Sequence, residues 1–457
     1  MKIVFLILAC VIAKVGFSQD TANVLTQTVF LQQVKENHPV ALVAGNNILQ
    51  AEQVIRLSKG AFDPVLFGGI DQKYYDGKTY YSTISTGVKI PTRLGVDFKV
   101  MGDWNNGDYL NPQNRVPDNG LTYLGVEVPI GRGLFTDERR TQLRRAGVAF
   151  QQSQLERQLT LNELLYQAGQ QFINWQEQEA QLNLALEGME LARVRLEQVK
   201  INVDLGERPS IDTVEASAQY YNRLIDVEQR KLNAANARLS IENYLWDQGV
   251  IPLTLESFVS PEQLTTEAPL KLLSDSIDQH PMLSWYDLKL QDLQLERKWK
   301  VEQLKPQLNV NYNLLQTPQN LVSGNYSFTN YKWGATLYMP ILLRKERSSL
   351  AITRFKIEST QWELQQKQRD LRTKQLQVRN EWNATFQQAE ASFTSAQRYN
   401  QLAIAERSLF ELGESSLFLI NSREQSYLSA QSKYLEYAAK TRKSALAEQF
   451  ALGNLGR

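Results

Sequence analysis

The sequence predicts a mixed α+β fold in which barrel-type antiparallel strands are set between very long helices. Three observations carry this prediction. The chain of 457 residues opens with an export signal, contains the same pattern twice, and changes hydrophobic period from helical to alternating and back within each copy. The two copies indicate an internal structural duplication.

The composition excludes several classes of protein. Lys+Arg is 50 and Asp+Glu is 49, so no charge bias indicates a nucleic-acid partner. The chain has two histidines, His38 and His280, and one cysteine, Cys10. These counts argue against thiol catalysis, disulfide frameworks and multi-histidine metal sites. No phosphate loop, Ser-His-Asp set or paired-carboxylate site is visible, so we expect no enzyme activity, no metal and no cofactor.

Residues 1–19 read as a cleaved signal peptide. Lys2 precedes an apolar run over residues 3–13, and the small residues Gly16 and Ser18 follow at the positions that a signal peptidase reads. The alternative is a lipoprotein site at Cys10, in which case that residue is lipidated. Both readings take the protein out of the cytoplasm.

Three landmarks occur twice and in the same order. They are Glu36-Asn37-His38-Pro39 with Asp278-Gln279-His280-Pro281, Val128-Pro129-Ile130 with Met339-Pro340-Ile341, and Leu205-Gly206-Glu207 with Leu412-Gly413-Glu414. The offset between copies is 242 residues at the first pair, 211 at the second and 207 at the third, so the first copy carries about 31 extra residues before the second landmark. We assign the first repeat to 20–248, the second to 276–457, and a proline- and polar-rich connector to 249–275.

Alternating segments predict strands over about 64–130 in the first repeat and about 306–341 in the second. No apolar stretch of the mature chain approaches the ~20 residues of a membrane helix, so a membrane span would have to be a closed β-barrel. A soluble half-buried sheet gives the same alternation. The export signal, the aromatic residues and the asparagines on the inner face favour an outer-membrane barrel. The first repeat holds four strand-like runs, and whether the extra pair at about 84–101 joins the wall stays open.

Proline-free segments predict long helices. The first helix of each repeat is expected at about 24–59 and 276–304, and the long helices at about 136–205 and 343–412. Each long helix ends at a glycine and is followed at once by another helix start, which predicts two antiparallel helical hairpins with tips at about 206–210 and 413–416.

These features together resemble the TolC-like outer-membrane efflux protein family, the outer membrane factors. The matching segments are LGERPSIDTVEASAQ from Leu205, LGESSLFLINSREQSYLSAQ from Leu412, VEVPIGRG from Val126 and LYMPILLRK from Leu337. The resemblance implies a homotrimer whose strands form one barrel in the outer-membrane lipid and whose helices form a helical barrel through the periplasm. Family members usually give two strands per repeat. It also implies a passive exit duct for efflux or type I secretion, served by a periplasmic adaptor protein and an inner-membrane pump.

The resemblance places a constriction and the adaptor-docking surface at the two tips. The residues concerned are Gly206, Asp212, Gly413, Ser415, Leu417, Leu419 and Ser422. Asp212 matches a family aspartate six residues after the glycine, although it could equally cap its helix. Leu419 and Ser422 stand where family members carry an acidic ring, and Phe410 replaces the tyrosine of their latch. We therefore expect a partly apolar constriction around Leu417 and Leu419.

Two further readings stay open. The chain could instead be a soluble periplasmic coiled-coil scaffold or adaptor, with its strands forming a small soluble domain. A basic cluster follows the first strand-to-helix junction and would be either a solvated helix face or an anchor near the inner leaflet. Its members are Arg139, Arg140, Arg144 and Arg145.

Overall fold

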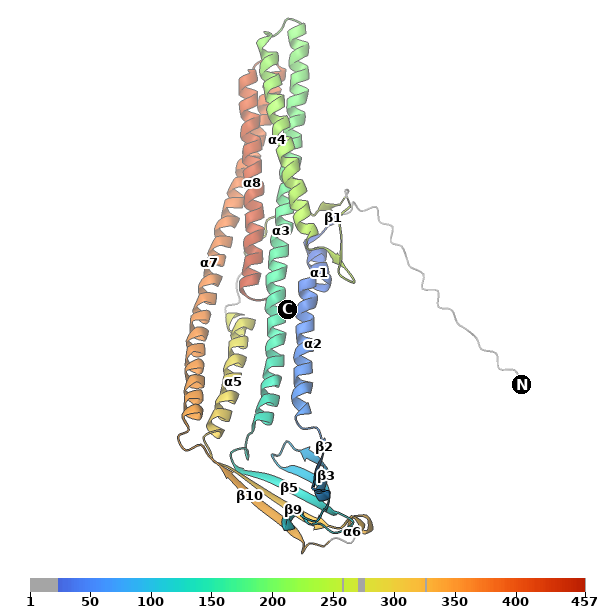
Figure 1. Ribbon diagram of the computed structural model, residues 1–457. Coiled ribbons are helices and arrows are strands. Elements are labelled where there is room, and N and C mark those ends of the chain that lie inside the picture. Colours follow the sequence, from blue (N-terminus) through green and yellow to red (C-terminus); the bar gives the residue numbers. More distant parts are fainter. Residues whose placement is uncertain (1–23, 257–258, 270–275, 325–326, 457) are drawn as a thin grey trace, which may run out of the picture. The chain divides into compact units, whose positions relative to one another are not determined.

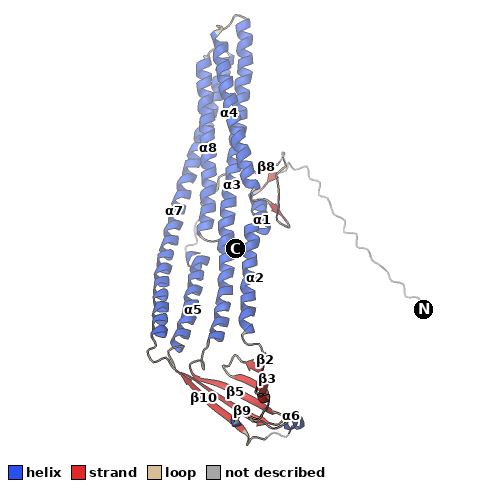
Figure 2. Ribbon diagram, viewed as in Figure 1, coloured by secondary structure: helices blue, strands red, loops and turns tan. Residues whose placement is uncertain are grey.

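The computed structural model describes residues 24–256, 259–269, 276–324 and 327–456. The expected signal peptide with Cys10 lies outside these residues, as does part of the connector. Helices dominate, and most strand residues belong to one six-stranded sheet (Figures 1 and 2). The predicted mixed α+β fold is confirmed. Within the described ranges, no helix combines the length and the hydropathy that crossing a membrane requires.

The chain divides into two compact units, and each draws on both repeats. The tip unit comprises 1–38, 167–269 and 382–446, and the sheet unit comprises 39–166, 270–381 and 447–457, both as far as they are described. Three long helices contribute residues to both units. These are α3 (Glu138–Asp204), α7 (Arg344–Glu411) and α8 (Leu417–Ala451). At 67 and 68 residues, α3 and α7 are nearly equal in length, as the duplication requires.

The tip unit contains further short elements and one long helix. They are β1 (Val24–Leu25), α1 (Gln27–Asn37), α4 (Ile211–Glu242), β6 (Trp246–Asp247), β7 (Ile251–Pro252) and β8 (Ser260–Pro261). Its aromatic core joins α1 to α3: the Phe30 ring stacks on Phe172 at 5.3 Å between centroids, and Phe172 meets Trp175 edge-on at 5.8 Å. All three rings are fully buried, so they fix where α1 lies along α3.

The sheet unit contains the large sheet and the helices that adjoin it. Its elements are α2 (Pro39–Gly60), β2 (Val65–Tyr75), β3 (Lys78–Pro91), β4 (Asp97–Asn106), η1 (Pro112–Asn114), β5 (Leu121–Gly131), η2 (Ser276–Gln279), α5 (Pro281–Glu302), β9 (Gln307–Gln316), α6 (Pro318–Ser323) and β10 (Tyr331–Tyr338). The strand order is β10-β9-β5-β4-β3-β2, with every neighbouring pair antiparallel. The pair that the sequence left open, β3 and β4, lies inside this sheet, between β2 and β5.

The first helix differs from its expected course over 24–59. It breaks at His38, whose φ of −66° and ψ of 135° are extended rather than helical. Pro39 causes the break, because a proline disfavours helical geometry at the preceding residue. His280 occupies the matching place in the second repeat, where its Nδ1 accepts a hydrogen bond from the Met282 amide at 3.1 Å and caps α5. His38 therefore ends α1, and His280 begins α5.

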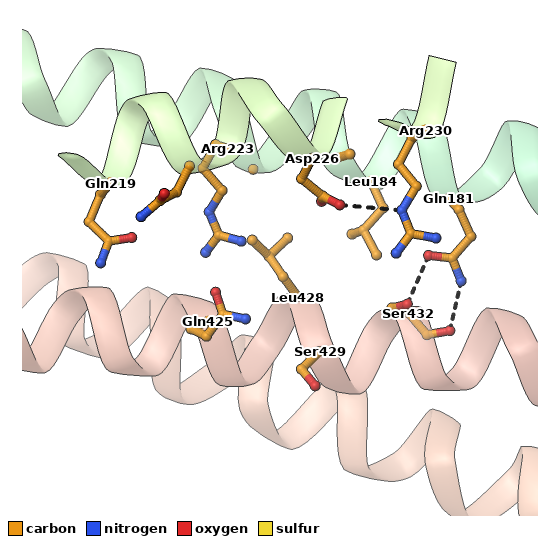
Figure 3. Close-up of a pocket in the computed structure, with 13 residues that line it drawn as sticks. Gln181, Leu184, Gln219, Arg223, Asp226, Arg230, Gln425, Leu428, Ser429 and Ser432 are labelled. Carbon is orange, nitrogen blue, oxygen red and sulfur yellow. Dashed lines mark hydrogen bonds and ion pairs between the residues drawn. The ribbon is translucent and has the colours of Figure 1, made fainter. Parts of the chain in front are cut away.

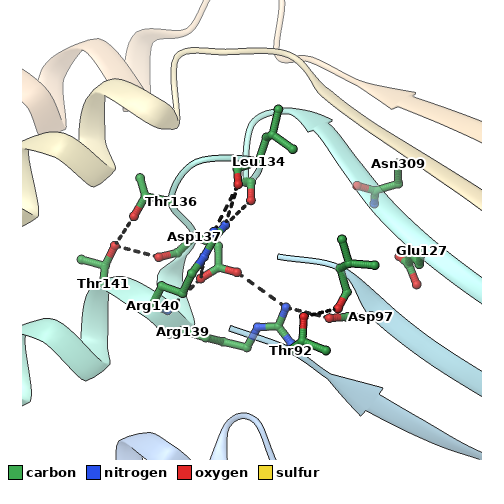
Figure 4. A network of polar contacts seen from close by, with 12 residues as sticks. Thr92, Asp97, Glu127, Leu134, Thr136, Asp137, Arg139, Arg140, Thr141 and Asn309 are labelled. Atoms are coloured by element: carbon green, nitrogen blue, oxygen red, sulfur yellow. Dashed lines mark hydrogen bonds and ion pairs between the residues drawn. The ribbon is translucent and has the colours of Figure 1, made fainter. Parts of the chain in front are cut away.

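The basic cluster at the start of α3 is not simply a solvated face, because three of its arginines are paired within the sheet unit. Arg139 donates to the Asp97 carboxylate at 3.2 Å, and Arg140 donates to the Leu134 carbonyl at 3.2 Å (Figure 4). Arg145 forms a two-point pair with Asp292 at 2.7 and 2.8 Å. The pairing and hydrogen bonds to Asp292 raise the pKa of Arg145. Arg144 alone is exposed.

Candidate functional site: the two helical tips

The first tip is a helix end closed by a glycine in the left-handed conformation. Gly206 has φ +78°, its amide donates to the Val203 carbonyl at 2.9 Å, and the Glu207 amide donates to the Asn202 carbonyl at 2.8 Å. These two bonds form a Schellman motif, which satisfies carbonyls that the helix end leaves without an intrahelical partner. The chain then turns through Pro209 into α4.

The second tip repeats this geometry atom for atom. Gly413 also has φ +78°, its amide donates to the Phe410 carbonyl at 3.1 Å, and the Glu414 amide donates to the Leu409 carbonyl at 2.9 Å. The Ser416 hydroxyl then accepts from the Leu419 amide at 3.2 Å and caps α8. The duplication thus extends to the hydrogen bonds of the turn, because both sequences place glycine at the one position that needs a positive φ.

We expect Gly413→Ala to destabilise the tip unit by about 1–2 kcal/mol, since a left-handed residue with a Cβ carries that strain. Space is not the cause, because nothing lies within 4 Å of a Cβ built at this position. Gly147→Ala, inside α3 near its start and equally free of neighbours, is the control and should stabilise by about 1 kcal/mol. Denaturant midpoints of the two variants, measured in detergent, check the prediction; equal effects would contradict it.

A small apolar core, here called the tip core, holds the two hairpins together just behind the turns. It draws on all four helices, with Val199 from α3, Ala216 from α4, Phe410 from α7, and Leu417 and Ile420 from α8. Phe410 is 6% exposed and Leu417 is 3% exposed. The tip core is therefore an apolar contact that packs the two hairpins against each other.

Phe410 is also joined to the first tip by a charged residue. The Arg208 guanidinium lies over the Phe410 ring, 4.3 Å from its centroid, and pairs with the Asp212 carboxylate at 3.5 Å. Two residues that the sequence singled out separately, Asp212 and Phe410, are thus linked through a third. The position that carries a tyrosine latch in the resembled family here makes a cation–π contact instead.

The expected constriction residues separate into two groups. Leu419 is 37% exposed and Ser422 is exposed, so both are available at the surface of α8. Leu417 is buried in the tip core and cannot line a passage in this conformation, which corrects its expected place. The Ser415 hydroxyl donates to the Glu406 carboxylate across the second turn. Of the two leucines expected at a constriction, only Leu419 is exposed in this conformation.

A layer of buried charge lies next to the tip core and bridges the hairpins. Arg195 of α3 donates to the Glu424 carboxylate of α8 at 2.7 Å, and both side chains are 7% exposed. Arg407 of α7 reaches the same carboxylate at 3.3 Å. Burial lowers the pKa of Arg223 on α4, and the charge of Glu424 opposes that shift. Glu424 thus pairs with arginines of α3 and α7 and interacts electrostatically with Arg223 of α4.

A polar groove of about 440 Å³ follows this layer, between α4 and α8 with α3 as its floor (Figure 3). Asp226 and Arg230 pair on the α4 side at 3.4 Å, while Gln181 of α3 and Ser432 of α8 exchange hydrogen bonds at 2.8 and 2.9 Å. Leu184 and Leu428 lie among these polar groups. The two hairpins are therefore packed tightly at their tips and separated by polar space farther along.

Sequence reasoning missed Arg208, Arg195 and Glu424. One local signal was available for Arg208, because it stands four residues before Asp212, at ion-pair spacing. The Arg195–Glu424 pair joins residues 229 positions apart, and no local pattern reveals it. Within the described chain, no group of three His, Cys, Asp or Glu side chains is placed to hold a metal ion.

The arrangement of sheet, long helices and hairpins is the fold of solved outer-membrane channels. The chain matches the CmeC channel of Campylobacter jejuni with TM-score 0.66 and 14% identity, over 94% of this chain and 85% of that one. It matches the open state of the MtrE channel of Neisseria gonorrhoeae with TM-score 0.68 and 12% identity, over 94% and 89%. It matches the VceC outer-membrane protein of Vibrio cholerae with TM-score 0.63 and 11% identity, over 93% of this chain and 96% of that one.

These structures confirm at the level of the fold the resemblance predicted from the sequence. No protein-family model matches the sequence, and comparison with curated proteins finds no relative.

Proposed function

We propose that this protein is an outer-membrane channel, the exit duct of a tripartite efflux or type I secretion system. Three copies close their sheets into one barrel in the outer membrane, and their hairpins extend into the periplasm as a helical barrel. Substrate delivered by an inner-membrane pump passes through without chemistry, and a periplasmic adaptor docks at the tips. The shared fold with solved outer-membrane channels is the observation that carries this proposal.

The geometry of the sheet supports a place in the membrane. Its side chains sort into an exposed apolar face and a polar face, which a lipid-embedded wall around an aqueous lumen requires. Among the described residues, the outer sides of β2 and β10 have no strand partner, and lipid offers no partner to unpaired backbone groups. Pairing with the edge strands of further copies would satisfy those groups. A membrane location of this sheet therefore requires oligomerisation.

The packing at the tips is consistent with a gate that opens when the hairpins change their packing. The tip core and the Arg195–Glu424 layer hold the two hairpins of one chain together, while the polar groove leaves room between them. Rotation of one hairpin against the other would exchange one packed arrangement for another. Gly206 and Gly413 fix the turns. In the proposed channel, Ser415, Leu419 and Ser422 contribute to the narrowing and to the adaptor-docking surface.

Fractionation and gel analysis test the proposal. The mature protein is expected in the detergent-soluble outer-membrane fraction, as a trimer that dissociates on heating, and it should conduct ions when reconstituted in a planar bilayer. A monomer that stays in solution without detergent would contradict the channel and favour the alternative of a soluble periplasmic scaffold or adaptor.

Leu419→Asp with Ser422→Asp is expected to make the channel sensitive to block by multivalent cations. The double substitution would place two carboxylates per chain at the narrowing, and such rings attract cations. The unchanged protein should conduct at cation concentrations that block the variant, with single-channel current as the measurement. Strong cation block of the unchanged protein would contradict an apolar narrowing at Leu419.

A further inference from the structure

The six-stranded sheet ends in two long edge strands that are open along their outer sides. β2 has 11 residues and β10 has eight, lengths close to the ~9–11 residues of a tilted membrane strand. Within the described residues, β2 pairs only with β3 and β10 only with β9. Because all five pairings are antiparallel, β2 and β10 run in opposite directions, and a second copy can continue the antiparallel order across either edge.

An apolar face runs across all six strands without a gap. One cross-strand row consists of Leu66, Val88, Val100, Leu124, Leu314 and Tyr331, one residue from each strand. A second row consists of Ile90, Phe98, Val126, Tyr312 and Trp333. At the two edges, Leu66 and Trp333 are well exposed. The strands β2, β3 and β4 thus present the same kind of surface as β5, β9 and β10, and that surface suits lipid along its whole width.

The opposite face is polar from β3 to β9, and its ion pairs tie β3 and β4 to β5. Lys89 of β3 pairs with Asp97 of β4 at 3.0 Å and with Glu127 of β5 at 3.5 Å. Lys99 of β4 pairs with the same Glu127, and Arg139 of α3 holds Asp97 at 3.2 Å. The sheet continues this polar face through Asn311 and Asn313 of β9. Ion pairs from β3 to β5 would have no place in a hairpin folded away from the wall.

We propose that all six strands form the lipid-facing wall, and that β2 of one copy pairs with β10 of the next. This inference rests on the proposed assembly of three copies. Three six-stranded sheets then close into an 18-stranded barrel. Because β3 and β4 lie inside the sheet, a four-stranded wall would have to lose the edge pair β2–β3 instead, which would leave 12 strands in all. Barrel diameter grows roughly linearly with strand number, so the barrel is about one and a half times as wide as in the 12-stranded case.

Cysteine crosslinking between edges tests the pairing in the full-length protein in outer membranes. The chain has no cysteine after Cys10, so introduced thiols have no native competitor. Val65→Cys and Asp71→Cys on β2 are each combined with Lys332→Cys and Thr336→Cys on β10, all on the face opposite the apolar rows. Oxidation is expected to give covalent dimers and trimers on a non-reducing gel for at least one combination. Each single variant, treated identically, is the control and should give no covalent trimer.

A matched set on β4 distinguishes the alternatives. Met101→Cys and Asn105→Cys lie on the same face and are combined with the same β10 positions. Crosslinks from β4 to β10 without any from β2 would overturn the 18-stranded wall, while the trimeric channel would stand. The absence of both kinds from protein that is trimeric by native mass measurement also overturns the edge pairing. A monomeric native mass would overturn the proposed function itself.

Discussion

Glu424→Gln is expected to lower the free energy of unfolding of the tip unit by about 3–5 kcal/mol. The change leaves the Arg195 guanidinium buried opposite a neutral amide, and breaking one side of a buried ion pair costs on this scale because the remaining charge lacks compensation. Arg407 loses the same acceptor, so two of the four helices lose their charged contact with α8. Guanidinium-induced unfolding of the detergent-solubilised protein, followed by helical circular dichroism, measures the loss.

Two controls separate burial from charge. Glu190→Gln removes an acid that pairs with Arg193 at 2.7 Å on the exposed side of α3, and it should leave the unfolding midpoint unchanged because exposed pairs contribute little. Replacing both buried partners, with Arg195→Met and Glu424→Leu, should recover most of the stability, since apolar residues of similar volume remove the desolvation cost. A large loss in the Glu190 variant, or none in Glu424→Gln, would contradict the account.

Periodicity determined how much of the fold could be predicted. The alternating runs and proline-free segments indicate the type of the long helices and of the strands of the large sheet. The repeated Leu-Gly-Glu predicted both turns because glycine is almost required where φ is positive. The interruption at His38 was recognisable as a helix start but not as a break. Whether β3 and β4 belong to the sheet depends on pairing between strands that the local pattern leaves open.

The tip was less predictable because its contacts are long-range. Glu424 reads as one more charged residue on a polar helix until the fold brings Arg195 beside it. The sequence did contain a signal for the burial of Leu417. Leu417, Ile420, Glu424 and Leu428 recur at three and four residues, the spacing of one helical face, and all four are buried. The family resemblance directed attention to residue positions after the glycine, whereas helical spacing decides which of them face inward.

In the proposed channel, Phe410→Ala is expected to loosen the hairpins and favour the open state. The ring fills the tip core between residues of α3, α4 and α8, and removing a buried phenylalanine side chain typically costs about 3–5 kcal/mol. The cation–π contact with Arg208 disappears with it. Because this core joins one hairpin to the other, the loss falls on the contact that an opening rotation would break. Single-channel conductance should rise, and cells should become sensitive to a large antibiotic that does not cross an intact outer membrane.

Phe418→Ala is the matched control, because Phe418 lies eight residues later on the same tip and is 74% exposed. It should leave stability and resting conductance unchanged, so any effect of removing an aromatic ring from the tip surface is subtracted. Arg208→Ala removes the cation above the ring but keeps the tip core, and it should give a smaller rise in conductance than Phe410→Ala. A variant that loses stability at Phe410 while its resting conductance stays unchanged would mean that the tip core supports the fold without acting as the latch.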